Sequence, residues 1–404
     1  MDDGPGEPTQ SVRVLLVADV RSPHTWGWVD AVRRAGITVL GADGQPWPDR
    51  QEDISLTQSH RGRFQQHLRS FVVVSPGRLK AAGAFLRLLG PALAVIQGWR
   101  LRRVVRAAVP DVVHALRIPY EAMMAVAAVP PDVPLAVSIW GNDLTLFAPS
   151  NRLVAAVTRR VVSRTDLLIA DCQRDLDLAS SWGLRPGIPT AVLPGGGGID
   201  LADLSVAGEI DVLKAIPHID EEHRLVVNPR GVREYVRNDV LLKAMESLSH
   251  DIDPTVRFIF VDTARDNGLK QAIASHPLSD RCIVTGKLSR ARVLALLKRT
   301  EVMASITDHD GTPNSLLEAM AAGAVPVCGD LPSIREWIEP GHNGFLAAID
   351  DPRAVAEALR LSLGLSDAER WAIRAENAQL IATRAERGST GRKAADQYRR
   401  LIGK

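Results

Sequence analysis

Asp310 and Glu318 bracket seven residues within 308–328, DHDGTPNSLLEAMAAGAVPVC. An ionised carboxylate one turn inside a helix, as expected for Glu318, could accept two hydrogen bonds from a vicinal diol such as a ribose. Asp310 would precede that helix, where it could hold hydroxyl groups on whatever extends from a nucleotide's phosphates. The pair predicts a nucleotide-sugar site.

The chain between the two acids is expected to turn from a loop into a helix over 314–322. Proline at 313 suits a first helical turn, and Gly323 suits a helix end. The unpaired N–H groups and positive dipole of a helix N-terminus could bind a diphosphate. The expected donor-binding residues here are Gly311, Thr312, Pro313, Asn314 and Ser315. The alternative is a capped amphipathic helix whose acids only face water.

A basic loop, NPRGVREYVRND at 228–239, follows an expected strand. Loops after the first strand of a doubly wound sheet commonly bind phosphate, and guanidinium groups match phosphate oxygens bidentately. Fixed cations could take up the charge of a departing diphosphate without a metal. Arg230 and Arg237 are the candidates, and Arg233 is left open. The alternative is a solvated basic turn.

Two polar segments in the first half follow expected strands, Ser22-Pro23-His24-Thr25 and Trp140-Gly141-Asn142-Asp143. Both should lie at strand carboxyl ends, so we expect His24, Trp140, Asn142 and Asp143 on the acceptor side of the site. His24 or Asp143 could hydrogen-bond the acceptor or the transferred sugar. A single histidine near a sheet edge is as often structural.

A metal is not indicated. Of three Asp-x-Asp pairs, at 175/177, 251/253 and 308/310, only the last falls in the expected site, and Glu318 already explains Asp310. Gly-x-Ser-x-Gly, Gly-x-Gly-x-x-Gly and Walker sequences are absent, so serine hydrolysis, dinucleotide redox and P-loop chemistry lack their motifs.

The bulk properties fit a globular chain of two domains. The 404 residues are 46% hydrophobic and 24% charged, with a net charge of +2 that does not favour nucleic acid. Three separated cysteines predict no disulfide framework and suit a reducing cytoplasm. Residues 1–10 read as a flexible lead-in, and no apolar run reaches membrane-spanning length.

Apolar strands alternate with helical segments in both halves, which indicates parallel sheets covered on both faces. Strands are expected at 12–19, 112–115, 134–140, 166–171, 189–194, 224–228, 256–262, 282–286, 302–306 and 324–328. Helices are expected at 25–35, 151–164, 238–248, 266–275, 289–299, 314–322, 333–338, 351–363 and 366–402. The sequence thus predicts two doubly wound α/β domains that face each other across a cleft. The first would span 11–205 and the second 206–384, with 385–404 packing back on the first. GGGG at 195–198 would approach the hinge.

The segment 78–106 is basic and apolar together. It could lie on an anionic membrane surface. It could equally form two core helices with arginines outward, and this interpretation is favoured because Pro91 breaks any long interfacial helix.

With these features together, the chain resembles retaining glycosyltransferases of the GT-B fold, specifically family 4, the group 1 glycosyltransferases. The resemblance covers nearly the whole chain and rests on SPHTWGWVDAVRRAG, DVVHALRIPYE, SIWGND, LPGGGGID, NPRGVREYVRND and, most specifically, DGTPNSLLEAMAAGAVPV. It implies sugar transfer from a nucleotide-sugar to an acceptor hydroxyl, with front-face attack and retention at the anomeric carbon. Glu318 would then hold the ribose and Asp310 the donor sugar, while Val284 and Lys287 would lie near the nucleobase.

Three departures from the family pattern stand out. Asp310 is one methylene shorter than the usual glutamate, the basic loop lacks a lysine that Arg237 could replace, and SIWGND lacks a histidine, leaving Asp143 as the nearest candidate. The alternatives are a nucleotide-sugar epimerase or hydrolase on the same fold, and a non-catalytic glycosyltransferase-like partner protein. A UDP-sugar is the expected co-substrate, with no permanently bound cofactor. The acceptor, a saccharide, a lipid-linked sugar or a small molecule, stays open, as does peripheral contact with the inner face of the membrane.

Overall fold

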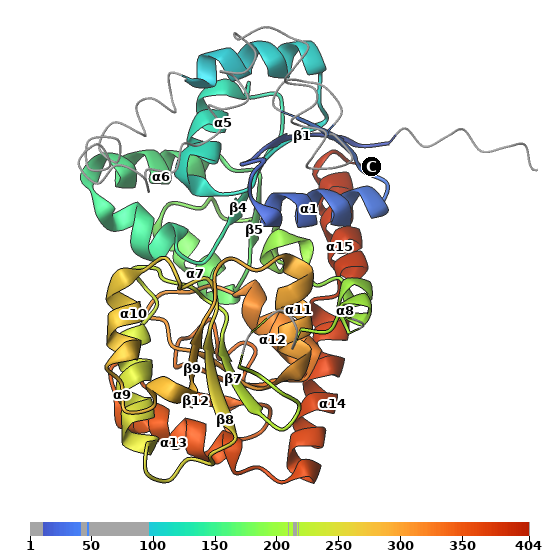
Figure 1. Cartoon of the computed structure of the whole chain (residues 1–404). Coiled ribbons are helices and arrows are strands. Elements are labelled where there is room, and N and C mark those ends of the chain that lie inside the picture. Colours follow the sequence, from blue (N-terminus) through green and yellow to red (C-terminus); the bar gives the residue numbers. More distant parts are fainter. Residues whose placement is uncertain are drawn as a thin grey trace, which may run out of the picture. The chain divides into compact units, whose positions relative to one another are not determined.

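The computed structural model describes residues 11–41, 47, 97–208, 210–212, 216 and 218–403. The chain divides into unit 1, Met1–Gly198 with Arg387–Lys404, and unit 2, Ile199–Glu386 (Figure 1). The division falls after Gly198 rather than after residue 205, because Ile199 packs into a core of unit 2 and bridges to Glu386. The expected lead-in 1–10 and residues 78–96 of the basic segment lie outside the described residues.

Unit 1 is built on a six-stranded parallel sheet with the order β2-β1-β3-β4-β5-β6. Its strands are β1 (Arg13–Val17), β2 (Thr38–Leu40), β3 (Val112–Ala115), β4 (Leu135–Ile139), β5 (Leu167–Ala170) and β6 (Thr190–Val192). Most of these residues are buried and apolar, as expected for strands covered on both faces.

Alternate residues of this sheet bury against different helices, because successive side chains of a strand point to opposite faces. Leu15 and Val17 share a core with α5 (Met123–Ala128), α6 (Arg152–Arg164), α7 (Gln173–Ser181) and the helical residues 97–108. Val14 and Leu16 share another core with α1 (Pro23–Arg34) and α15 (Arg387–Leu401). Short turns over Ile118–Ala122, Asp143–Phe147, Ala148–Ser150 and Gly195–Gly197 complete the unit.

Glycines bring α1 into close contact with α15 and with the GGGG segment. A Cβ on Gly391 would lie 2.0 Å from the carbonyl oxygen of Ala31, and one on Gly27 would lie 2.2 Å from that of Gly196. Gly196 has φ +74°, a conformation that favours glycine. The expected hinge glycines therefore also serve as a packing surface for α1.

Unit 2 contains a second six-stranded parallel sheet, with the order β12-β11-β10-β7-β8-β9. Its strands are β7 (Arg224–Asn228), β8 (Val256–Phe260), β9 (Cys282–Val284), β10 (Thr300–Ser305), β11 (Val325–Gly329) and β12 (Phe345–Ala347). One face packs against α9 (Asn238–Leu248), α10 (Asn267–Ala274) and α13 (Pro352–Leu363). The other faces α8 (Leu201–Ala207), α11 (Arg290–Arg299), α12 (Asn314–Ala322) and α14 (Asp367–Arg384).

The two Rossmann-like domains were predicted, but several elements differ. The three-residue edge strands β2 and β12 were not expected, since they are too short for an alternation signal. Residues 332–337 form turns instead of the helix predicted over 333–338, with hydrogen bonds that skip between three- and four-residue spacing. The predicted helix 366–402 is broken at Ala385-Glu386 into α14 and α15. None of the helices in the described part of the chain has the length and apolar character needed to cross a bilayer.

Candidate functional site

The carboxyl edge of the unit 2 sheet contains a topological switch point between β7 and β10. Strand order runs outward from β7 through β8 to β9, and the chain then returns to add β10 on the other side of β7. Loops leaving two such strands diverge and open a crevice, the usual ligand position of a doubly wound sheet. The loop after β7 carries Arg230, and the loop after β10 carries Asp310.

Two buried asparagines hold the loop after β7. Asn228 Nδ2 donates to Asn238 Oδ1 (2.7 Å), and Asn228 Oδ1 accepts from the backbone N–H of Arg230 (3.0 Å). Asn238 Nδ2 donates in turn to the carbonyl of Gly231 (3.3 Å), which has φ +66°. The start and end of the loop are thus tied together, which fixes the backbone from which Arg230 projects.

Arg230 joins the two predicted halves of the site. Its Nη2 donates to Asp310 Oδ2 (2.6 Å) and its Nη1 to Ser315 Oγ (3.1 Å). Its Nε is buried and has no hydrogen-bond partner among the described residues. The guanidinium carbon also lies 5.9 Å from the centre of the Tyr235 ring. A largely buried cation with a donor to spare is suited to an additional anion.

The N-terminus of α12 lies beside Arg230 and carries no side-chain cap. Pro313 precedes the helix in an extended conformation and Gly323 ends it with φ +90°. The preceding loop is fixed from the 332–337 turns: Ser333 Oγ donates to the carbonyl of Asp310 (2.7 Å), and Trp337 Nε1 donates to Thr312 Oγ1 (3.0 Å). The predicted helix and its start are confirmed.

Glu318, one turn further along α12, is paired with an arginine that the sequence did not single out. Arg290 Nη1 donates to Glu318 Oε1 (2.5 Å), and Arg290 Nε lies 3.6 Å from Asp203 of α8. Arg290 is the first residue of α11, whose cap is Ser289. In the sequence, the only feature that marks Arg290 is its place at a capped helix start, because its partner Glu318 is 28 residues away.

The structure does not bring Arg237 into the Arg230 cluster. Its guanidinium instead binds Asp239 (3.0 Å) and Asp350 (2.6 Å). Arg233 is exposed and donates from Nε to the carbonyl of Arg230 (3.2 Å), so it braces the loop. Val284 is half-buried and is the last residue of β9, and Lys287 is exposed three residues later, beyond the carboxyl end of that strand.

A buried thiol lies beside the Arg230–Asp310 pair. Burial, helped by the charge of Asp310 and opposed by that of Arg230, raises the pKa of Cys328 to about 12. The thiol is therefore protonated at neutral pH and offers no nucleophile. The chemistry of the cluster is that of fixed charges and hydroxyl-binding carboxylates.

Unit 1 has its own switch point, between β1 and β3, and Asp143 lies beneath it. Asp143 is fully buried, accepts from the backbone N–H groups of Ile118 (3.1 Å) and Trp140 (3.2 Å), and pairs with Arg117 (3.4 Å). Burial raises its pKa and Arg117 opposes the rise. Asp143 was predicted to hydrogen-bond the acceptor or the transferred sugar, but its side chain is fully buried and instead holds the backbone of the loops that carry Ile118 and Trp140.

Glu121 shares this buried cluster and was missed by the sequence argument. Burial raises its pKa to about 8, against the opposing charge of Arg117. Glu121 Oε2 and Arg117 Nε have no hydrogen-bond partners among the described residues. Between them Tyr120 has φ +69°, a strained conformation for a bulky residue and one that concentrates at functional sites. The signal that could have been used was an arginine and a glutamate directly after a buried strand.

The remaining acceptor-side candidates lie near strand ends of the same unit. His24 is exposed, with its ring edge-on to that of Trp140 at 5.5 Å. Asn142 is half-buried and its Oδ1 has no hydrogen-bond partner in the described part of the chain. The structure thus brings His24 and Trp140 together, next to the backbone that Asp143 holds.

Asp171, Cys172 and Asp175 offer ligand atoms within 4.8 Å of one another, all buried. Asp175 is paired with Arg174 (2.7 Å), and Asp171 accepts from the backbone N–H of Gly141 (3.3 Å). An arginine already supplies the positive charge here, so the cluster is explained by loop packing.

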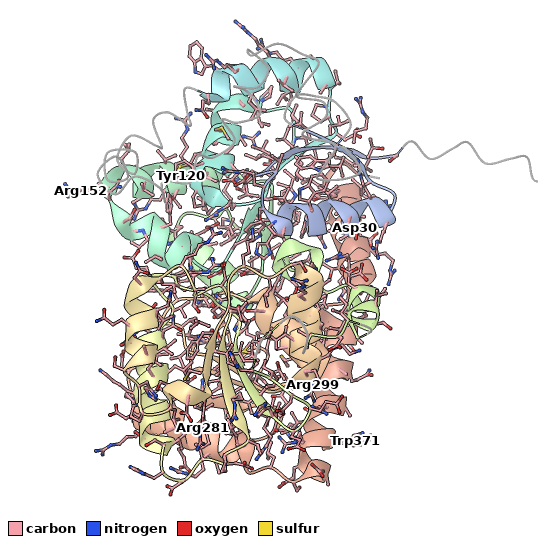
Figure 2. All side chains as sticks on the ribbon, viewed as in Figure 1. Asp30, Tyr120, Arg152, Arg281, Arg299 and Trp371 are labelled. Carbon is pink, nitrogen blue, oxygen red and sulfur yellow. The ribbon has the colours of Figure 1, made fainter. Side chains whose placement is uncertain are left out.

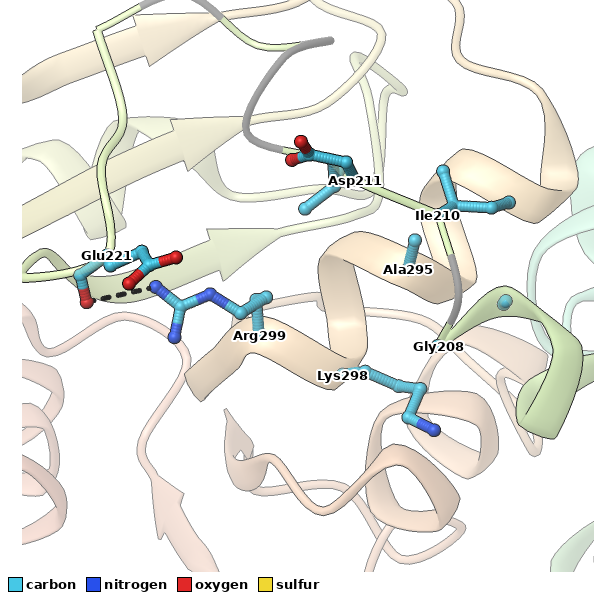
Figure 3. A pocket seen from close by; sticks show the side chains of 9 residues that line it. Gly208, Ile210, Asp211, Glu221, Ala295, Lys298 and Arg299 are labelled. Atoms are coloured by element: carbon cyan, nitrogen blue, oxygen red, sulfur yellow. Dashed lines mark hydrogen bonds between the residues drawn. The ribbon is translucent and has the colours of Figure 1, made fainter.

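A hollow of about 530 Å³ lies elsewhere on unit 2, between α11 and the segment after α8 (Figure 3). Arg299 crosses its edge and donates to the carbonyl of Glu221 (3.2 Å), while Lys298 reaches along the opposite side. None of its lining residues belongs to the Arg230–Asp310 cluster, so the hollow is separate from the candidate site.

Comparison with known proteins relates both units to glycosyltransferase families. Residues 209–379 match the family model of glycosyl transferases group 1, and residues 10–196 match that of the glycosyl transferase 4-like domain. Both units are glycosyltransferase domains. The Arg230–Asp310 cluster and α12 lie in the group 1 domain, and Arg117 and Glu121 lie in the 4-like domain.

The glycosyltransferase domains have a distant curated relative, the GDP-mannose:cellobiosyl-diphosphopolyprenol alpha-mannosyltransferase of Xanthomonas campestris. The match is 25% identical over 171 residues and spans 41% of this chain and 45% of the relative. The match covers less than half of either protein. It therefore supports the glycosyltransferase class but does not identify the donor or the acceptor.

Solved structures show the fold. A glycosyltransferase from Rickettsia africae matches with a TM-score of 0.67 and 12% identity over 98% of this chain and 99% of that one. Anabaena HepE, solved with UDP and glucose, matches with a TM-score of 0.66 and 16% identity over 96% and 99%. The predicted GT-B fold is confirmed.

Proposed function

We propose that this protein is a retaining glycosyltransferase that moves a sugar from a nucleotide-sugar to an acceptor hydroxyl. The observation that carries the proposal is the convergence of Arg230, Asp310 and the uncapped start of α12 at the β7/β10 switch point. This convergence provides an anion site next to a carboxylate, which is what a sugar diphosphate requires.

Donor binding would rearrange the charges already present. The Arg230 guanidinium would turn from Asp310 toward the diphosphate, aided by its unpartnered Nε and the N-terminal N–H groups of α12. Asp310 would then be free to accept hydrogen bonds from the sugar hydroxyls. Glu318, held in place by Arg290, would accept from the ribose hydroxyls. Val284 and Lys287 would flank the base.

The proposed donor is a UDP-sugar. HepE, of the same fold, was solved with UDP and with UDP-glucose, while the curated relative is named for GDP-mannose. Binding of UDP, GDP and ADP should therefore be compared directly, since a ligand that binds the native state raises its stability with concentration.

The proposed acceptor site is the β1/β3 switch point of unit 1, around His24, Trp140 and Arg117. A saccharide or lipid-linked saccharide fits such a polar edge with an aromatic ring, and the curated relative is named for a lipid-linked acceptor. Asp143 would act by positioning Trp140 and Arg117 rather than by contact.

In the proposed reaction the bond between the anomeric carbon and the diphosphate oxygen breaks. The acceptor oxygen bonds to the same face, and its proton passes to the departing diphosphate. Arg230 and α12 neutralise the charge that develops on that diphosphate. Because these groups are fixed, a chelator should leave turnover unchanged. The product should have the anomeric configuration of the donor.

The decisive assay is nucleoside diphosphate release that requires an added acceptor. Arg230→Ala should weaken UDP binding roughly ten- to hundredfold, the value of one charged hydrogen bond, and Glu318→Ala should impair it as well. Arg335→Gln, which removes an exposed arginine paired with Asp330, is the matched control and should leave binding unchanged. Release without acceptor would indicate a hydrolase, and intact activity in Arg230→Ala would refute the proposed site.

A further inference from the structure

The helix over 97–108 in unit 1 exposes a continuous basic and aromatic stripe. Trp99, Arg102, Arg103 and Arg106 follow the three- and four-residue spacing of one helix face, and all are exposed. Trp99 is 77% exposed, and Val109, just after the helix, is 70% exposed. A single exposed aromatic ring is common at protein surfaces, but this one lies in a row with three exposed arginines.

The opposite face of this helix is already used by the core. Leu101, Val105 and Ala108 are buried in the core cluster that they share with α5 and α6. Gly98 lies so close to α5 that an added Cβ would meet the Cβ of Ala127 at 2.7 Å. The helix is therefore fixed in rotation, and the exposed stripe faces away from the core formed by the described residues of unit 1.

Charge on this stripe is uncompensated. The sequence from 97 to 110 contains four arginines and no carboxylate. None of Arg100, Arg102, Arg103 and Arg106 forms an ion pair in the part of the chain that the structure describes. Some arginines elsewhere in the protein are paired with a carboxylate, for example Arg335 with Asp330. The charge is thus available to an anionic partner.

A neighbouring helix adds to the same character. α6 carries four arginines and no acid, and Leu153 on it is 43% exposed. Arg152, at the start of α6, points away from the ribbon (Figure 2). α5 packs against α6 and also against Gly98, so both basic helices belong to one layer of unit 1.

We propose that this layer, presented by residues 99–109 and the start of α6, docks on an anionic membrane surface. Arginines would pair with lipid phosphates, while Trp99, Val109 and Leu153 would enter the interface, where tryptophan is preferred. The exposed aliphatic side chains of Val109 and Leu153 beside the arginines favour a lipid over a nucleic acid, which would use polar and stacking groups instead. The inference does not depend on the proposed transferase activity.

The test is sedimentation of the full chain with vesicles of phosphatidylcholine alone or mixed with phosphatidylglycerol. We expect binding only to the mixed vesicles, and weaker binding as salt is raised. The triple variant Arg102→Gln, Arg103→Gln and Arg106→Gln should reduce the partition coefficient roughly a hundredfold, since each basic side chain near such a surface is worth about a factor of five. Trp99→Ala should reduce it by a smaller factor.

Matched controls come from α14 and α13. Trp371 is 71% exposed and points outward (Figure 2), but it follows Asp367 and Glu369 on its helix. Trp371→Ala and the double variant Arg353→Gln, Arg360→Gln should bind vesicles as the parent does. Equal binding of the triple variant, no binding to mixed vesicles, or capture of an RNA oligonucleotide with no vesicle binding would each overturn the proposal. Unchanged far-ultraviolet dichroism would show that the variants fold.

Discussion

At the residue scale, the two candidate carboxylates of the group 1 domain are each paired with an arginine. Asp310 is held by Arg230 and Glu318 by Arg290, both from other elements. Removing one partner of such a pair would leave the other charge buried and unpaired, which is strongly destabilising. An anion bound beside Arg230 could offer that arginine a new partner.

The buried ring of His114 should make the free energy of unfolding depend on pH. It is fully buried between Tyr398 (2.7 Å) and Ser138 (2.9 Å), and burial lowers its pKa to about 3. Below pH 6.5 the unfolded chain gains a proton that the folded chain does not, so the free energy of unfolding should fall as pH falls toward 3. The loss should be about 2 kcal/mol at pH 5.

Chemical unfolding of unit 1 followed at pH 7 and pH 5 would measure this loss. His114→Gln, which keeps hydrogen-bonding capacity without the titrating ring, should flatten that part of the pH dependence. If the variant and the parent lost stability in parallel, other groups would be responsible.

At the element scale, α15 and α1 pack so closely that only glycine fits at their crossing. The hydrogen bond from Trp28 Nε1 to Tyr398 Oη (3.1 Å) and the contact of Gly391 with Ala31 tie the last helix to the first. α15 also contacts β3, because the Tyr398 hydroxyl of α15 is hydrogen-bonded to His114 of that strand.

Gly391→Ala should destabilise unit 1 despite the better helix propensity of alanine. The propensity gain is at most about 1 kcal/mol, but the added Cβ would lie 2.0 Å from a backbone oxygen of α1. Overpacking of this kind typically costs about 1–3 kcal/mol, so the net change should lower the thermal midpoint. Gly268→Ala in α10, where the nearest atom is a side-chain oxygen at 3.4 Å, is the control and should not destabilise. A neutral Gly391→Ala would show that α1 and α15 can separate without cost.

At the scale of the whole molecule, the chain is two domains with separate cores and separate switch points. The proposed donor groups lie after β7 and β10 of unit 2, and the proposed acceptor groups lie after β1, β3 and β4 of unit 1. On this proposal, the nucleotide alone should engage only unit 2.

Hydrogen exchange with saturating UDP should therefore show protection confined to unit 2. We expect slower exchange in 228–238 and 306–318, with the strands of unit 1 unchanged. Nucleotide at a hundredfold excess over its dissociation constant should stabilise the native state by about 2.7 kcal/mol. GDP and ADP provide the comparison for base preference. Protection in the loops after β1 and β3 instead would place the nucleotide in unit 1 and contradict the proposed donor site.

The sequence by itself determined the two parallel sheets. Short, mostly apolar runs such as VVHA and RLVVN are typical of strands that are buried on both faces. It also determined the helix that carries Glu318, because Pro313 and Gly323 mark its ends locally. Only the tertiary structure decided the partners: the pairing of Arg230 with Asp310, the pairing of Glu318 with Arg290, and the burial of Asp143 all join residues from separate elements. Local propensity acts over a few residues, whereas a charge is paired or buried by whichever distant element the fold brings beside it.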